Sequence, residues 1–146
     1  MKKPVSVLLA LCLVSGVNAE QATVAVAANF ASSMGELEAL FEADGIHELT
    51  VVSGSTGQLY AQIVNGAPYD VFLAADRERP RLLAEAGLGN APFAYALGRL
   101  ALWTREPRFT DGLTVEVLAG DDFRRLAIAN PRLAPYGVAA RETLQT

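Results

Sequence analysis

The sequence predicts an α/β fold in which a parallel sheet carries helices on its faces. Three apolar runs of strand length, at 23–28, 48–53 and 69–75, are each followed by apolar residues at helical spacing. The runs are continuously apolar, as is typical of strands that are buried on both faces. Three strand and helix pairs in succession therefore predict parallel strands joined by helical crossovers.

Local signals mark the ends of the expected helices. The first helix is expected over 29–45, with Gly45 as its C-terminal stop. The second lies over 59–64 and ends at the turn signal "NGAP". The third begins after Asp76, whose side chain we expect to cap it, and ends at Gly87.

The pattern changes after the third helix. We expect a strand at 98–104, a loop at 106–112, and a short helix or turn leading into a strand over 122–130. Another helix begins within the final segment, 131–146. Because the chain stops within that helix, before the second unit has completed a sheet, we expect the sequence to be truncated.

The N-terminal segment has the three parts of a secretory signal peptide. Lys2 and Lys3 precede the apolar run "PVSVLLALCLVSG", and the small residues "VNA" precede Glu20. We therefore expect residues 1–19 to be removed after Ala19 and the protein to function in the periplasm. The alternative, an N-terminal membrane anchor, is disfavoured because the apolar run is shorter than the roughly 20 residues that span a bilayer.

The expected mature chain is acidic and contains no cysteine. Cys12, the single cysteine, lies in the signal segment, so the mature chain has no disulfide, thiol chemistry or cysteine metal ligand. Both lysines lie there too, which leaves ten arginines against sixteen acidic residues and a net charge of about −6. Nucleic-acid binding needs a basic face, so we expect no nucleic-acid partner.

Two uncharged corners follow the first two expected strands. They are "AANFASS" and "SGSTGQ", and they offer the side-chain donors Asn29, Ser32, Ser33, Ser53, Ser55 and Thr56. In open parallel sheets, ligands bind beyond the carboxyl ends of the strands. A helix that begins there adds unpaired N–H groups and about half a positive charge. The composition therefore favours an anion site, although ordinary helix capping uses the same residue types.

The absence of charge at these corners indicates which anion fits. Neutral donors can hold a fully deprotonated oxyanion, because every oxygen accepts, and each such hydrogen bond contributes about 1.5–3 kcal/mol. Hydrogen phosphate would need an acceptor for its proton, and an amino acid or a metal cation would be left unpaired. The corners therefore favour sulfate-like or molybdate-like dianions.

At these residues the chain resembles the periplasmic molybdate-binding proteins of ABC transporters. The resemblance rests on "VAVAANFASSM", "SGSTGQLYAQIVNGAPYDVFLAAD" and "LAIANPRLAPYGVAARETL", and it covers essentially the whole mature segment. It implies a type II periplasmic binding fold, in which two α/β lobes close around a tetrahedral oxyanion. The expected division is a signal peptide at 1–19, a first lobe at 20–96 and the start of an incomplete second lobe at 97–146.

The resemblance also implies a set of ligand-binding residues. The first corner contributes Asn29, through its backbone N–H and side chain, with Ala28 just before it. The second corner contributes Thr56, or Ser55 if the register differs by one residue. From the second lobe comes the backbone N–H of Tyr136. Further family ligands would follow the last residue of this chain.

The function that the resemblance implies is transport rather than catalysis. A monomeric receptor would capture molybdate, or equally tungstate, through neutral hydrogen bonds, and deliver it to an ABC permease with its ATPase subunit. No cofactor is expected, and no residue is expected to bind a metal cation directly, since the molybdenum enters as an oxyanion.

Catalytic and metal-binding interpretations find less support. "GSTG" lacks the lysine of a phosphate loop and is one residue short of the G-x-S-x-G nucleophile elbow. His47, the one histidine, is expected at the surface, without a His or Cys partner for zinc. Asp70 and Asp76 are expected to fix loops around the third strand, and Tyr95 and Trp103 to lie in the core or at the rim. The alternatives are a receptor for another tetrahedral oxyanion, such as sulfate, and an exported hydrolase that uses an oxyanion corner.

Overall fold

The computed structural model describes residues 20–109, 112–120 and 122–145. The expected signal peptide, with Cys12, lies outside the described residues. None of the helices in the described part of the chain has the length and apolar content that crossing a bilayer requires.

The strands form one parallel sheet in the order β2-β1-β3. Their bounds are β1 (Glu20–Ala27), β2 (His47–Gly54) and β3 (Val71–Leu73). β1 pairs with β2 along its whole length, up to Ala27 opposite Gly54, and with β3 from Val24 opposite Val71. The parallel α/β sheet that the sequence predicts is confirmed.

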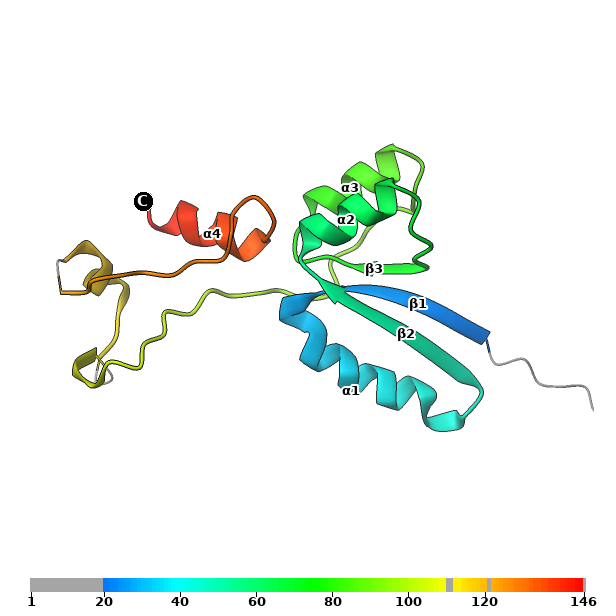
Figure 1. The fold of residues 1–146 in the computed structure, drawn as a ribbon, viewed down its shortest axis with the longest axis horizontal. Helices are drawn as coiled ribbons and strands as arrows, with labels where there is room; N and C mark the ends of the chain where they lie inside the picture. The colour runs from blue at the N-terminus through cyan, green and yellow to red at the C-terminus, as the bar shows by residue number, and fades with distance from the viewer. Residues whose placement is uncertain (1–19, 110–111, 121, 146) are drawn as a thin grey trace, which may run out of the picture.

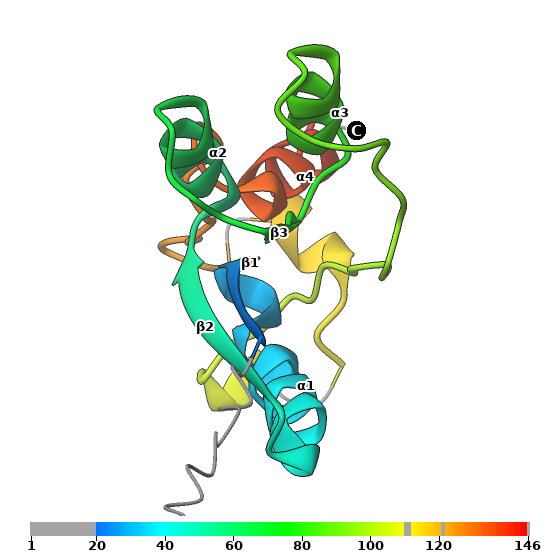
Figure 2. The same ribbon diagram turned by 90° about the vertical axis from the view of Figure 1, so that its right-hand side faces the viewer.

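Helices cover both faces of this sheet (Figure 1, Figure 2). α1 (Ala31–Phe41) lies on one face, and α2 (Thr56–Val64) and α3 (Glu78–Glu85) lie on the other. The last four residues of the central strand β1 are at most 4% exposed. Val24 and Val26 pack against Met34 of α1 in the core. This burial on both faces explains why β1 is continuously apolar.

The predicted helix stops at Gly45 and Gly87 are confirmed, whereas α2 begins at Thr56, three residues before the expected start. The first expected helix is a succession of η1 (Ala28–Phe30), α1 and η2 (Glu42–Asp44), where η denotes a 3-10 turn. Gly45 and Gly87 follow helices with φ of 69° and 71°, which is left-handed backbone that glycine adopts without strain. Asp76 accepts a hydrogen bond from the N–H of Arg79 at 2.9 Å, although α3 begins two residues after Asp76. The N-cap of α3 is Arg77, so Asp76 lies one residue before the cap and holds the first turn through the N–H of Arg79, rather than serving as the N-cap that we expected.

The second part of the chain departs from the prediction. Residues 90–106 and 125–130 contain neither helix nor strand, so the strands predicted at 98–104 and within 122–130 are wrong. A segment becomes a strand only when its backbone pairs with a neighbouring strand, and no described residue supplies that pairing here. Trp103 accordingly stays 75% exposed.

The later elements are short turns and one helix. They are η3 (Pro107–Phe109), η4 (Val115–Ala119) and α4 (Pro135–Thr143). η3 falls in the expected loop, and the short helix or turn expected near residue 122 is only a bend at Arg124. α4 confirms the helix predicted in the final segment, and Figure 1 shows it near the end of the sheet where α2 begins.

Candidate functional site

The sheet register brings the two uncharged corners together. Ala27 and Gly54 are paired, so the residues that follow them leave the sheet at the same edge. Ala28 and Asn29 lie in η1 and are exposed at that edge. The second corner continues directly into α2. Two groups of neutral donors, separate in sequence, therefore lie side by side beyond the carboxyl ends of β1 and β2.

Ser55 is the N-cap of α2 and is held in a capping box. Its hydroxyl accepts from the N–H of Gln58 at 3.3 Å and donates to Gln58 Oε1 at 2.8 Å. Gln58 Oε1 also accepts from the N–H of Ser55 at 3.3 Å. The Ser55 hydroxyl proton is thus bound by Gln58 within the corner. Ser55 therefore serves as an ordinary helix cap, which was one of the two roles that the sequence allowed for the residues of this corner.

Thr56 is the first residue of α2, and it is only 1% exposed. Its hydroxyl oxygen accepts a hydrogen bond from the N–H of Ala75, just past β3, at 3.1 Å. A hydroxyl that accepts one bond keeps its own proton for donation. The structure therefore fixes the Thr56 oxygen against the end of the sheet, and among the described residues no acceptor for its O–H is observed.

The second corner also touches the chain that leads into α4. The N–H of Gly57 donates to the carbonyl oxygen of Leu133 at 3.1 Å. A helix leaves its first N–H groups without partners inside the helix. In α2 the N–H of Gln58 donates to the Ser55 side chain, and the N–H of Gly57 donates to Leu133. Among the described residues, the N–H of Thr56 is the one in this turn that no hydrogen bond uses.

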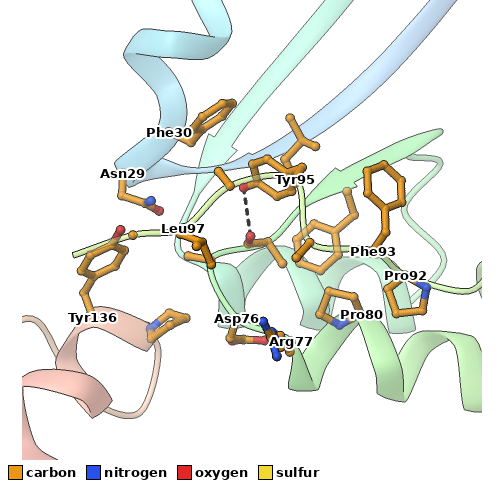
Figure 3. Close-up of a pocket in the computed structure, with 18 of the residues that line it drawn as sticks. Asn29, Phe30, Asp76, Arg77, Pro80, Pro92, Phe93, Tyr95, Leu97 and Tyr136 are labelled. Carbon is orange, nitrogen blue, oxygen red and sulfur yellow. Dashed lines mark hydrogen bonds between the residues drawn. The ribbon is translucent and has the colours of Figure 1, made fainter. Parts of the chain in front are cut away.

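A cavity of about 920 Å³ connects the first corner with α4 (Figure 3). Asn29 and Tyr136 both line it, and Figure 3 shows the Tyr136 side chain rising from the head of α4 toward Asn29. Tyr136 is the second residue of α4, after Pro135 at the position where a helix tolerates proline best. Ala28, Ser55 and Thr56 do not line this cavity. The structure thus brings Asn29 and Tyr136 together and places the second corner beside them.

Charged residues outside the corners also line this cavity. They are Asp76, Arg77, Arg81 and Arg99. Asp76 is already bound to the guanidinium of Arg79 and also accepts from the main-chain N–H of Arg79. The corners themselves are uncharged, but the cavity as a whole is not. The signal was present in the sequence, because Asp76 follows the third strand and must emerge at the same edge as the two corners.

Tyr95 also lines the cavity, although the sequence did not point to it as a site residue. Its hydroxyl donates to the carbonyl oxygen of Ala74 at 2.9 Å, and its ring meets Phe30 edge-on at 5.2 Å between centroids. Burial, and secondly the nearby Tyr136, raise the pKa of Tyr95 above its ordinary value. Tyr95 therefore remains a neutral donor that ties segment 91–100 to the end of β3.

The acidic residues that invite a catalytic interpretation have structural partners. Asp70 accepts from the N–H of Thr23 at 2.7 Å and donates its own N–H to the carbonyl of Thr23 at 2.9 Å, which extends the pairing of β1 with β3. His47 begins β2 and lies 3.8 Å from the carboxylate of Asp44. Within the described ranges, no three His, Cys, Asp or Glu side chains gather as a metal site would require.

A parallel sheet with a cavity beyond its carboxyl edge has the geometry with which open α/β folds bind small ligands. The family model for bacterial extracellular solute-binding proteins matches residues 22–146, and the chain belongs to this family. Its relatives include two proteins named molybdate-binding protein ModA. That of Azotobacter vinelandii is 42% identical over 134 residues, which cover 90% of this chain and 53% of the relative. That of Rhodobacter capsulatus is 41% identical over 142 residues, which cover 93% of this chain and 56% of the relative.

A solved structure shows the same fold. The periplasmic molybdate-binding protein of Azotobacter vinelandii superposes with a TM-score of 0.76 at 42% identity, over 85% of this chain and 54% of that one. The match confirms the periplasmic-binding-protein fold that the resemblance implies. The chain spans about half the length of the relatives it matches.

Proposed function

We propose that the protein is a periplasmic receptor that captures molybdate, or equally tungstate, as a monomer and delivers it to an ABC permease with its ATPase subunit. The observation that carries this proposal is the pairing of Ala27 with Gly54, which gathers two sets of uncharged donors at one edge of the sheet. The relatives named as molybdate-binding proteins support the choice of anion. Membership of a solute-binding family supports binding rather than turnover.

The proposed ligands are main-chain and neutral side-chain donors. Asn29 contributes its N–H and amide, with Ala28 beside it, and Tyr136 contributes its main-chain N–H. Thr56 contributes its O–H, whose oxygen is already held by the N–H of Ala75. Ser55 stays the alternative at the second corner, but its hydroxyl proton would first have to leave Gln58. Each bond to the dianion contributes about 1.5–3 kcal/mol, so several together offset its lost hydration.

The same proposal divides the chain into a signal peptide at 1–19, a first lobe at 20–96 and the start of a second lobe at 97–146. The first lobe carries both corners, and the second carries Tyr136. Residues of both lobes would contribute to one site. The hydrogen bond from Gly57 to Leu133 supports this arrangement, because it holds a residue near the head of α4 against the second corner.

Isothermal titration calorimetry on the purified protein tests the function. Molybdate and tungstate should release heat and raise the melting temperature by mass action, whereas hydrogen phosphate should not. Sulfate offers the same acceptors at a smaller radius, so it is the competitor that tests anion size. Tighter binding of sulfate than molybdate would reassign the ligand. No heat with either metal oxyanion, together with tight binding of a cation or a sugar, would overturn the proposal.

A further inference from the structure

Segment 97–99 passes directly against the side chain of Tyr136. A Cβ built on Gly98 would overlap the Tyr136 hydroxyl and would lie 2.8 Å from Cζ and 3.5 Å from Cε1. Side chains do not approach Cβ atoms within 3.0 Å, so any residue other than glycine would displace the tyrosine. The position of the Tyr136 ring therefore depends on the absence of a side chain at residue 98.

Backbone conformation does not account for this glycine. Four glycines of the described chain have positive φ, namely Gly45, Gly66, Gly87 and Gly112, and Gly98 is not among them. Alanine could adopt the backbone angles of residue 98 without left-handed strain. What glycine provides at this position is room, and the neighbour that uses the room is Tyr136.

The segment around Gly98 is itself anchored to the first corner and the sheet. Tyr95 donates its hydroxyl to Ala74 just past β3, and its ring packs edge-on against Phe30, the residue after Asn29. Figure 3 shows Tyr95 on this segment, with Asn29 and Tyr136 on the other side of the same cavity. A shift of the Tyr136 ring relative to Gly98 is therefore also a shift relative to Asn29.

We propose that Gly98 is a positioning residue of the oxyanion site: it admits the Tyr136 ring against segment 97–99 and so sets the head of α4 opposite the first corner. This inference rests on the proposed function, because it assigns Gly98 a role in holding the main-chain N–H of Tyr136 toward the anion. Gly98 does not touch the ligand. Its effect passes through the tyrosine ring.

The test compares Gly98→Ala with Gly89→Ala by calorimetry with molybdate. Gly89 is a matched control, because it precedes the same extended segment, lacks positive φ and has no atom within 4 Å of an added Cβ. Gly98→Ala should weaken binding by clearly more than the control does, because the far end of the Tyr136 side chain must shift to admit the added methyl group. Gly89→Ala should leave the dissociation constant within about twofold of the parent protein, since exposed substitutions have small effects.

A double-mutant cycle shows whether the effect passes through the ring. In the Tyr136→Ala background the added methyl at residue 98 meets no ring, so Gly98→Ala should there cost no further affinity. A loss of equal size in both backgrounds would overturn the inference. Unchanged molybdate binding by Gly98→Ala would also overturn it while leaving the proposed function intact. If the parent protein binds no molybdate, the function and the inference fall together.

Folding of each variant is checked by circular dichroism, so that loss of binding is not confused with loss of structure. If Gly98→Ala fails to fold, the double variant with Tyr136→Ala should recover the folded spectrum. Recovery supports the ring as the partner of Gly98. Failure of both variants to fold, with Tyr136→Ala alone folded, would contradict it.

Discussion

The main-chain N–H of Gly57 donates to the carbonyl oxygen of Leu133, and this bond joins the first turn of α2 to the chain that enters α4. A Cβ on Gly57 would lie 3.1 Å from the Leu133 oxygen and 3.3 Å from its Cα. Both distances are tighter than ordinary contacts, so the close approach of the two segments depends on glycine. The bond is thus a point where the second corner and α4 hold each other in place.

Gly57→Ala should lower the melting temperature or leave it unchanged. Alanine in a helix normally stabilises by about 0.5–1 kcal/mol relative to glycine. At Gly57 the added methyl pushes on the backbone of Leu133, and this offsets the gain. Gly35→Ala is the matched control, because Gly35 lies within α1 with nothing near an added Cβ. It should raise the melting temperature by about 2–6 °C. Equal increases for both variants would contradict the close contact.

Thr56→Val should weaken molybdate binding by about 1–3 kcal/mol, roughly 5- to 150-fold, because it replaces the hydroxyl by a methyl of similar size. It should also lower the free energy of unfolding by about 1–3 kcal/mol, since the N–H of Ala75 loses its acceptor. Calorimetry and urea unfolding measure the two effects separately. Thr56→Ser, which retains the hydroxyl, serves as the control. An unchanged dissociation constant for Thr56→Val would remove Thr56 from the ligand set.

Asn29→Leu should weaken binding at least as much as Thr56→Val while leaving thermal stability nearly unchanged. Asn29 is exposed, so its side chain contributes little to folding. Asn29→Asp keeps the shape but places a negative charge beside the dianion, and it should weaken binding further as ionic strength falls. Titrations at low and high salt separate these two variants. Similar salt dependence for both would argue against an anion at the first corner.

Tyr136→Phe should change the molybdate dissociation constant by less than about twofold, because the proposed contact is the main-chain N–H and the phenyl ring still packs at Gly98. Calorimetry on this single variant is sufficient. A large loss would show that the hydroxyl itself binds the anion, and the assignment of the contact to the main chain would then be wrong.

The raised pKa of Tyr95 predicts a loss of stability at alkaline pH. Burial, and secondly Tyr136, favour the neutral form in the folded state, so this contribution is complete below the ordinary pKa of 10.0 and is lost as pH rises through the folded pKa. Tyr95→Phe should therefore flatten the decline in the free energy of unfolding above about pH 10. Urea unfolding over this pH range measures the decline for the parent protein, for Tyr95→Phe and for the control Tyr60→Phe. A decline of the same slope in all three would contradict the prediction.

Much of the first part of the chain could be predicted from local pattern. The apolar run at β1 and the stops at Gly45 and Gly87 each depend on a few neighbouring residues, and the structure confirms them. The strand predicted at 98–104 failed because apolar composition does not supply a pairing partner. Its backbone stays unpaired among the described residues, and Leu97 just before it and Trp103 within it remain exposed.

For the candidate site, too, the sequence predicted the features that depend on neighbouring residues and missed those that depend on contacts between distant segments. Sequence alone identified the uncharged corners at Asn29 and Thr56, because helix starts that lack charge are visible in a short window. It did not identify Tyr95 as a cavity wall, or the need for glycine opposite Tyr136. Those depend on which segments meet after folding.

The sequence by itself determined the three strand and helix units and the neutral chemistry at the first two corners, since side-chain periodicity and backbone preference act over a few residues. Only the tertiary structure decided that β1 lies between β2 and β3, that Leu133 reaches Gly57 and that Tyr136 rests on Gly98. Such contacts join residues far apart in the chain, and close packing, rather than local preference, selects them.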